Sequence, residues 1–151
     1  GGPVHQGLGP GAFVQGYRAD LYTQVETLVY MALPERTHDV FCHNLAAKIE
    51  EPILAGLVDR IARDEVRHEL LFSNLVAHCL EYTRDETIAA IAARAADLRV
   101  PGADIDAYRD KVQNVEQAGV FGPEHLRQAI SDRITAWGLA DEPQLRQFVV
   151  G

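Results

Sequence analysis

Apolar residues recur at steps of three and four along most of this chain, which is the spacing of one face of an α-helix. Proline and glycine mark the ends: Pro34 ends the first helical segment, Pro52 opens the longest, and Gly119 and Gly138 stop the last two. No stretch alternates apolar and polar residues for long enough to indicate a strand, so the sequence predicts an all-α fold. The predicted helices span residues 17–33, 37–49, 52–81, 84–98, 105–118 and 123–137.

The longest predicted helix, residues 52–81, carries two ionisable side chains on the face that the pattern turns toward the core. A buried, unpaired carboxylate costs several kcal/mol, so Glu65 and His68 there require an explanation. Three remain open: the pair binds a metal, it is a hydrogen-bonded core pair, or the phase of the helix is misread. The face consists of Leu54, Val58, Ile61, Glu65, His68, Phe72, Leu75 and Cys79.

Two further acidic positions precede this helix. Glu26 lies on a stripe with Tyr22, Val29 and Leu33, and its position alone is more typical of a solvent border than of a ligand. The sequence from Glu35 to His38 repeats the Glu-x-x-His spacing of the longest helix, but it directly follows a proline, which favours a first helical turn. We therefore interpret it as a solvated helix start rather than a ligand pair.

Composition limits the classes of function. The 151 residues are 47% hydrophobic, enough for one core, and the net charge of −8 argues against nucleic-acid binding and anionic membranes. No apolar stretch is long enough to cross a membrane and no signal peptide is recognisable, so we predict a cytoplasmic protein. Cys42 and Cys79 are isolated and predicted to be free, buried thiols.

The chain divides into three predicted parts. Residues 1–16 hold six glycines and two prolines and are expected to form a flexible leader. Residues 17–81 contain the helices with the candidate ligands, and residues 82–151 form a C-terminal helical extension.

Three segments resemble one known family over their whole length: 22–28 (YTQVETL), 44–52 (NLAAKIEEP) and 63–69 (RDEVRHE). They are similar to the soluble acyl-[acyl-carrier-protein] desaturases of bacteria, especially the actinobacterial ones, which are ferritin-like di-iron enzymes. The resemblance runs from about residue 14 to the C-terminus. It implies two oxygen-bridged irons in a four-helix bundle, held by one Glu from each of two helices and one Glu-x-x-His from each of the other two.

The resemblance also implies roles for individual residues. Glu26 would be the lone Glu of the second half of the bundle, and Glu65 with His68 its Glu-x-x-His. Asp64 would accept a hydrogen bond from a ligating His of the opposite helix pair, although it is equally expected to face a neighbouring Arg. Val29 stands where plant-type members carry Thr, so the hydroxyl near the oxygen site is missing.

The activity implied is the oxygen-dependent introduction of a double bond into a fatty acyl chain carried by acyl carrier protein, with electrons from a ferredoxin-type donor. Acyl carrier proteins are acidic and need a cationic surface to dock. Arg60, Arg63 and Arg67 lie roughly opposite the ionisable pair and form a candidate stripe. The preferred alternative is a solvated face with intrahelical pairs to Asp59 and Asp64.

Only half of the family's ligand set is recognisable, which admits three explanations. The chain is a fragment of a longer enzyme, or a remnant without metal chemistry, or it forms a homodimer in which two copies each contribute Glu26, Glu65 and His68. The main alternative function is a non-catalytic interaction or scaffold domain with these residues as a metal-free core cluster. A ferritin-like peroxidase or oxidase is a lesser alternative.

Overall fold

The computed structural model describes residues 23–151, so the predicted leader and the start of the first predicted helix lie outside the described residues. No strand occurs among residues 23–151, and the predicted all-α class is confirmed. The α-helices of this part are α3 (Gln24–Lys48), α4 (Pro52–Tyr82), α5 (Arg84–Asp97), α6 (Arg109–Gln117) and α7 (Pro123–Ala136), and η2 (Asp106–Tyr108) and η3 (Arg146–Phe148) are short 3-10 helices.

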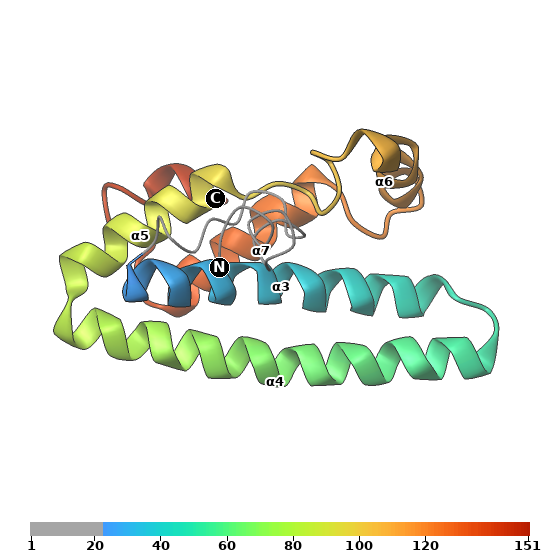
Figure 1. Cartoon of the computed structure of the whole chain (residues 1–151), viewed down its shortest axis with the longest axis horizontal. Coiled ribbons are helices and arrows are strands. Elements are labelled where there is room, and N and C mark those ends of the chain that lie inside the picture. Colours follow the sequence, from blue (N-terminus) through green and yellow to red (C-terminus); the bar gives the residue numbers. More distant parts are fainter. Residues whose placement is uncertain (1–22) are drawn as a thin grey trace, which may run out of the picture.

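Helices α3 and α4 form a long antiparallel hairpin, and the remaining helices lie along one side of it (Figure 1). Helix α3 contacts α4, α5 and α7, so it is the central element of the described fold. Helix α6 lies toward the end of the hairpin where α3 leads into α4 (Figure 1). No helix among residues 23–151 combines the length and the apolar character needed to cross a membrane.

Helix α4 begins and ends close to the predicted positions for local reasons. Glu51 caps its start by accepting a hydrogen bond from the backbone N–H of Leu54 at 2.6 Å, and Pro52 occupies the first turn. At the other end, Thr83 closes α4 through its N–H to Cys79 and then begins α5. Residues 83–86 (Thr-Arg-Asp-Glu) have the sequence pattern of a capping box at the start of α5, but no side-chain cap forms there.

The prediction that a helix ends before Pro34 is wrong, because α3 passes through this residue without interruption. Proline has no N–H, so one hydrogen bond of the helix is lost at this point. Leu33 before the proline and Thr37 after it are both buried, and the Thr37 hydroxyl donates to the Pro34 carbonyl at 2.6 Å. Packing on both sides of the proline thus compensates for the lost hydrogen bond, and the helix continues. Residues 35–38 consequently lie in the middle of a helix rather than at its start.

One continuous apolar core joins α3 to α4, α5 and α7 and extends to the C-terminal segment. A large apolar side chain removed fully from water contributes about 1.5–3 kcal/mol, so these positions account for much of the stability. The largest fully buried apolar side chains are Phe121, Leu33, Ile91, Ile134, Leu139, Leu145, Val29 and Val76.

Helix α4 has two contrasting faces. Its closed face, packed on the rest of the molecule, consists of Ala62, Glu69, Ser73, Val76 and Leu80. Its open face consists of the exposed apolar residues Leu54, Leu57, Ile61, Leu71 and Leu75. The predicted inward face of α4 was therefore about one position out of phase, because three of its apolar members are solvent-exposed in this part of the structure.

Candidate metal centre

Four side chains from two helices meet near the middle of the α3–α4 hairpin. Glu35 and His38 come from α3, and Glu65 and His68 from α4. His38 Nδ1 lies 3.9 Å from Glu65 Oε2, while His68 Nδ1 lies 3.9 Å from the Oε2 atoms of both Glu35 and Glu65. One potential ligand atom from each of Glu35, His38 and Glu65 falls within 4.8 Å of the others. We call these four residues the hairpin cluster.

The carboxylates of the hairpin cluster are more buried than its imidazoles. The Glu35 and Glu65 side chains are 13% and 22% exposed, whereas those of His38 and His68 are 50% and 58% exposed. The acidic groups thus lie between the two helices, and the imidazoles border on solvent at the same side.

Two neighbouring carboxylates in a partly buried site repel one another. The pKa of Glu35 is raised from 4.5 to about 8, first by burial, then by the adjacent Glu65, and least by the charge of Glu69. Its buried Oε2 atom has no hydrogen-bond partner in the described part of the chain. A bound cation would satisfy this oxygen and remove the repulsion.

The donor set fits a transition metal. Iron, manganese and zinc all bind carboxylate oxygens and imidazole nitrogens in proteins. A metal at this cluster therefore needs no cysteine ligand. Cys42 and Cys79 are free, as predicted, but only partly buried. Burial together with the charges of Glu65 and Asp39 raises the pKa of the Cys42 thiol.

Glu26 does not join the hairpin cluster, which corrects the predicted ligand set. Its Oε2 accepts a hydrogen bond from the Thr23 backbone N–H at 2.7 Å, while Thr23 Oγ1 accepts from the Glu26 N–H at 3.2 Å. This is a capping box, in which a carboxylate satisfies free N–H groups of the first helical turn. Glu26 lies nine residues before Glu35, or roughly 13 Å along the axis, too far to share an ion with Glu65.

Sequence reasoning missed Glu35 and His38 although a signal for both was present. Their Glu-x-x-His spacing equals that of Glu65 and His68, and it was set aside only because of the preceding proline. If Glu35 is the lone Glu ligand of α3, then His38, one turn later, stands where plant-type members carry Thr. Val29, which we had assigned to that Thr position, is fully buried in the core.

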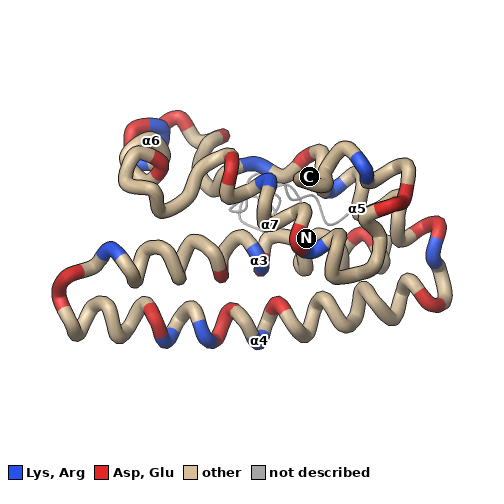
Figure 2. Tube along the Cα trace, turned by 180° about the vertical axis from the view of Figure 1, so that it is seen from behind, with Lys and Arg blue, Asp and Glu red and all other residues tan. Residues whose placement is uncertain are grey.

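The remaining predicted residues lie on the outer surface of α4. Asp64 is exposed and 3.9 Å from Arg67, and Arg63 lies 3.3 Å from Asp59. Acidic and basic residues are interspersed along this part of α4 (Figure 2). The intrahelical pairs expected for a solvated face therefore form, and pairs of this kind contribute little to stability. A role of Asp64 toward a ligating His of another helix pair stays a prediction.

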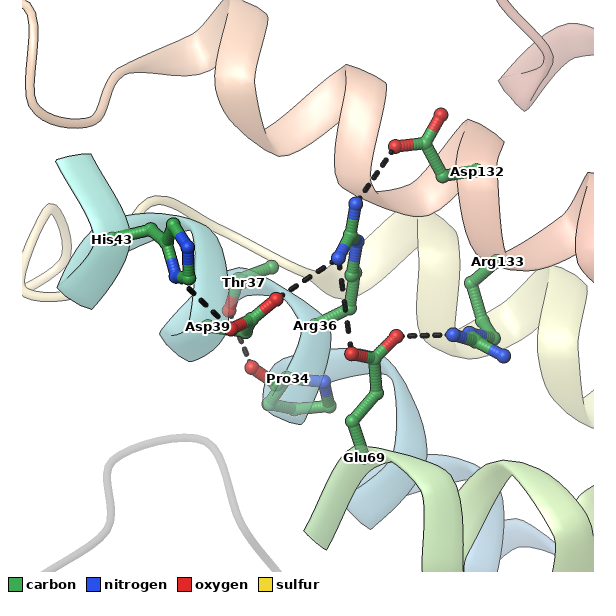
Figure 3. Close-up of polar contacts among 8 residues, drawn as sticks. All are labelled: Pro34, Arg36, Thr37, Asp39, His43, Glu69, Asp132 and Arg133. Atoms are coloured by element: carbon green, nitrogen blue, oxygen red, sulfur yellow. Dashed lines mark hydrogen bonds and ion pairs between the residues drawn. The ribbon is translucent and has the colours of Figure 1, made fainter. Parts of the chain in front are cut away.

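A buried ion network adjoins the hairpin cluster and ties it to α7 (Figure 3). Arg36 Nη1 lies 2.9 Å from Asp39 Oδ2 and 3.8 Å from Glu69 Oε2, and Arg36 Nη2 lies 3.3 Å from Asp132 Oδ2. Arg133 of α7 donates a hydrogen bond to the other oxygen of Glu69. Arg36 directly follows Glu35 and Glu69 directly follows His68, so the backbone beside two cluster residues is anchored to a third helix.

A small apolar pocket opens one helical turn beyond His38 on α3. Its volume is about 190 Å³. Lys111 is one of the lining residues, and its Nζ atom lies 4.8 Å from the centre of the Tyr108 ring. The pocket has an almost entirely hydrocarbon surface, which suits an aliphatic group rather than a polar ligand. It is lined by Phe41, Val100, Pro101, Gly102, Tyr108, Lys111, Val112, Val115 and Phe121.

A helical hairpin that carries Glu and Glu-x-x-His ligands toward one point is the building unit of carboxylate-bridged metal proteins. Comparison with known proteins agrees: residues 5–148 match the fatty acid desaturase family, and this chain belongs to that family.

The most informative relatives come from mycobacteria and plants. The chain is 77% identical, over 138 residues, to DesA2 of Mycobacterium tuberculosis (strain H37Rv), a candidate acyl-[acyl-carrier-protein] desaturase, covering 91% of this chain and 50% of that protein. It is 28% identical over 123 residues to the chloroplastic acyl-[acyl-carrier-protein] desaturase 7 of Oryza sativa subsp. japonica, covering 75% of this chain and 30% of that one.

A solved structure shows the same arrangement of helices. The X-ray structure of DesA2 from M. tuberculosis H37Rv superposes with a TM-score of 0.84 at 78% identity, over 85% of this chain and 53% of that chain. The expected ferritin-like helical fold is confirmed. The chain thus spans about half the length of its mycobacterial relative.

Proposed function

We propose that this chain supplies one half of the metal-binding bundle of an acyl-[acyl-carrier-protein] desaturase, which introduces a double bond into a carrier-bound fatty acyl chain. The observation that carries the proposal is the meeting of Glu35 with Glu65 and His68 between two adjacent helices. One Glu from one helix and one Glu-x-x-His from the next is half of the ligand set used by di-iron carboxylate proteins.

The metal we propose is iron, held here by Glu35, Glu65 and His68. When bound in a complete pair, iron supplies the oxygen-dependent oxidation that removes two hydrogens from the acyl chain. Of the chain's own residues, the two carboxylates provide negative charge for the cation. His68 provides a nitrogen ligand, and its position next to Glu69 fixes it relative to the buried ion network. Three ligating groups do not by themselves hold a bridged pair, so the second metal requires residues from a further bundle half.

The apolar pocket supports an aliphatic substrate. We propose it as a place for part of the acyl hydrocarbon, because its lining includes Phe41, three residues after His38 on α3. Burial of each methylene group is worth about 0.8 kcal/mol, enough for the pocket to favour a fatty acyl chain over a short polar substrate.

The proposed macromolecular partners are acyl carrier protein and a ferredoxin-type electron donor, and the expected cytoplasmic location belongs to the same proposal. The relatives' names refer to acyl-[acyl-carrier-protein] as substrate. Arg60, Arg63 and Arg67 are solvent-exposed on α4 and are the candidate contact to an acidic carrier. Arg63 and Arg67 would exchange their intrahelical partners Asp59 and Asp64 for the carrier's acidic groups.

The second bundle half comes, in our proposal, from another copy of this chain. The open face of α4 exposes five apolar side chains beside the hairpin cluster, which is characteristic of a surface that is covered by a partner. A two-fold axis through the cluster would bring together two Glu35 carboxylates and two Glu65-x-x-His68 pairs, completing the set. The corrected set thus replaces Glu26 by Glu35 in the predicted homodimer.

Sedimentation of the purified chain tests this homodimer. A dimer is expected that dissociates when Leu57 and Ile61 are both changed to Glu, because two charges would face the partner's apolar surface. A monomer at concentrations where iron binds would contradict the homodimer and point to an upstream segment of a longer protein as the other half.

Iron loading tests the metal centre. The metal-free chain is incubated with ferrous ion without oxygen, desalted, and analysed for iron per chain. Glu35→Gln and Glu65→Gln should lose most of the iron, whereas Glu26→Gln keeps its capping box and should retain it. Absence of iron from the unsubstituted chain would instead favour the non-catalytic scaffold function. A loaded sample supplied with acyl-[acyl-carrier-protein], reduced ferredoxin and oxygen should yield a product two hydrogens lighter by mass spectrometry.

A further inference from the structure

His38 is a member of the hairpin cluster that the desaturase ligand pattern does not use. That pattern needs one Glu and one Glu-x-x-His from this half of the bundle, and Glu35, Glu65 and His68 fulfil it. The imidazole of His38 nevertheless approaches Glu65 Oε2 to 3.9 Å, the same separation as between His68 and either carboxylate. A side chain in this position contributes a second nitrogen at the point where the ligands converge.

The two helices contribute to the cluster in a reciprocal way. His38 of α3 contacts Glu65 of α4, and His68 of α4 contacts Glu35 of α3. Each helix also carries its Glu three residues before its His, which places the two on the same face. Because α3 and α4 are antiparallel (Figure 1), two Glu-x-x-His segments face each other across the hairpin with each His against the opposite Glu.

The separations suit a single ion. Ligand atoms about 2.0–2.2 Å from one metal lie roughly 3–4.4 Å from each other. The atoms of Glu35, His38 and Glu65 already fall within 4.8 Å of one another, so small side-chain rotations bring them into range. The Glu35 Oε2 atom is buried and has no hydrogen-bond partner among the described residues, a second observation that points to a ligand at this place.

A purely structural role for His38 is less consistent with its surroundings. Half of its side chain is exposed, so it contributes little to the core. His43, on the same helix, shows what a surface histidine of α3 looks like: it is more exposed and pairs with Asp39 at 3.7 Å, away from Glu65. His43 is therefore a matched control for any experiment on His38.

We propose that His38 is a fourth protein ligand, so that the α3–α4 hairpin of one chain encloses a single transition-metal ion with Glu35, His38, Glu65 and His68. This inference rests on the metal centre of the proposed function and extends it. Two carboxylates and two imidazoles complete a four-coordinate site from one chain, whereas three groups would leave it open. The ion held in this way does not require the second bundle half.

Cobaltous ion is the probe, because its visible absorption reports the number and geometry of its ligands in a metal-free sample of the whole chain. One cobalt per chain is expected for the unsubstituted protein and for His43→Ala. His38→Ala and His68→Ala should each weaken binding by about tenfold or more, since even residues that only support metal ligands have effects of this size. His38→Ala should also change the visible spectrum toward that of a site with fewer nitrogen ligands.

A cysteine at the same position gives direct proof of coordination. His38→Cys should produce a near-ultraviolet sulfur-to-cobalt charge-transfer band that is absent from the unsubstituted protein and from His43→Cys. Far-ultraviolet circular dichroism of each variant separates loss of binding from loss of folding. If His38→Ala is helical and shows a cobalt affinity and spectrum equal to the unsubstituted protein, His38 is not a ligand and this inference is wrong. The metal centre of the proposed function then still stands, provided that Glu65→Gln and His68→Ala abolish binding. If the unsubstituted chain binds no cobalt, the metal centre itself is contradicted.

Discussion

The closed and open faces of α4 belong to the same helix but differ in burial and in the role of their ionisable residues. The closed face packs on α3 and α5 and buries Val76 and Leu80, while the buried carboxylate of Glu69 pairs with Arg133 of α7. The open face exposes a row of leucine and isoleucine side chains beside the hairpin cluster. Burial alone therefore does not identify the functional side of this helix. In this chain the buried acid, Glu69, belongs to a structural ion network, whereas the half-exposed side carries the candidate ligands.

The largest expected effect comes from the buried charge of the closed face. Glu69→Ala removes the partner of Arg133 and leaves that guanidinium buried and uncompensated, so we expect a loss of about 3–5 kcal/mol in the free energy of unfolding. Asp64→Ala removes an exposed carboxylate from the same helix and should cost less than about 0.5 kcal/mol. Urea denaturation of both variants measures the contrast. Similar losses would mean that the network of Figure 3 is not a stabilising unit.

Alanine substitution of one leucine on each face of α4 compares the two faces without a change of charge. Leu80→Ala on the closed face should destabilise the chain by about 2–4 kcal/mol, because it creates a cavity in the core. Leu57→Ala on the open face removes the same atoms from solvent and should cost about 0.5 kcal/mol or less in a monomer. A loss at Leu57 that grows with protein concentration would show that this face is covered by a second copy.

Metal that binds at the hairpin cluster should raise the free energy of unfolding of the chain. A ligand that binds only the folded state at one hundred times its dissociation constant raises the free energy of unfolding by about 2.7 kcal/mol. Thermal melts with and without ferrous or manganous ion should show this increase for the unsubstituted chain, and its removal by a chelator. In Glu65→Gln the increase should vanish, while Leu57→Ala should keep it. An increase that persists in Glu65→Gln would place the ion elsewhere.

The last effect concerns the proton that Glu35 holds when no metal is bound. The pKa of Glu35 is raised from 4.5 to about 8, so the folded chain holds a proton that the unfolded chain releases between these values. For this group, therefore, stability is lost as pH rises through the interval. With a chelator present, Glu35→Gln and the unsubstituted chain should have similar stability near pH 4.5, and Glu35→Gln should be the more stable one at pH 8. Parallel stability curves across this range would contradict the raised pKa.

The helical architecture was predictable because its signals are local. Pro52 and Glu51 define the start of α4, and Gly119 and Gly138, both with positive φ, end the two last predicted helices as expected. Pro34 was misleading. The helical hydrogen bond that it removes can be inferred from the local sequence, but the tertiary packing of Leu33 and Thr37 that compensates for this loss cannot. The sequence alone cannot weigh one against the other.

The candidate site was predicted only in part for the same reason. Glu65 and His68 were found because they interrupt an apolar pattern within a single helix. Identifying Glu35 instead of Glu26 required knowing that α3 continues past its proline and which of its turns lies opposite Glu65. The ion network was not predicted, because Arg36, Glu69 and Arg133 come from three helices and no spacing within one of them reveals the contact.

The chain contains a single tryptophan, and its position gives the hairpin cluster a natural optical reporter. Trp137 donates from its indole nitrogen to the Ser73 carbonyl of α4 at 3.1 Å, and the Arg133 guanidinium lies 5.7 Å from the centre of its ring. Arg133 in turn holds Glu69, the residue after His68. Because these contacts link the indole to the residue beside His68, we expect metal binding at the cluster to change the intrinsic fluorescence of the unlabelled protein.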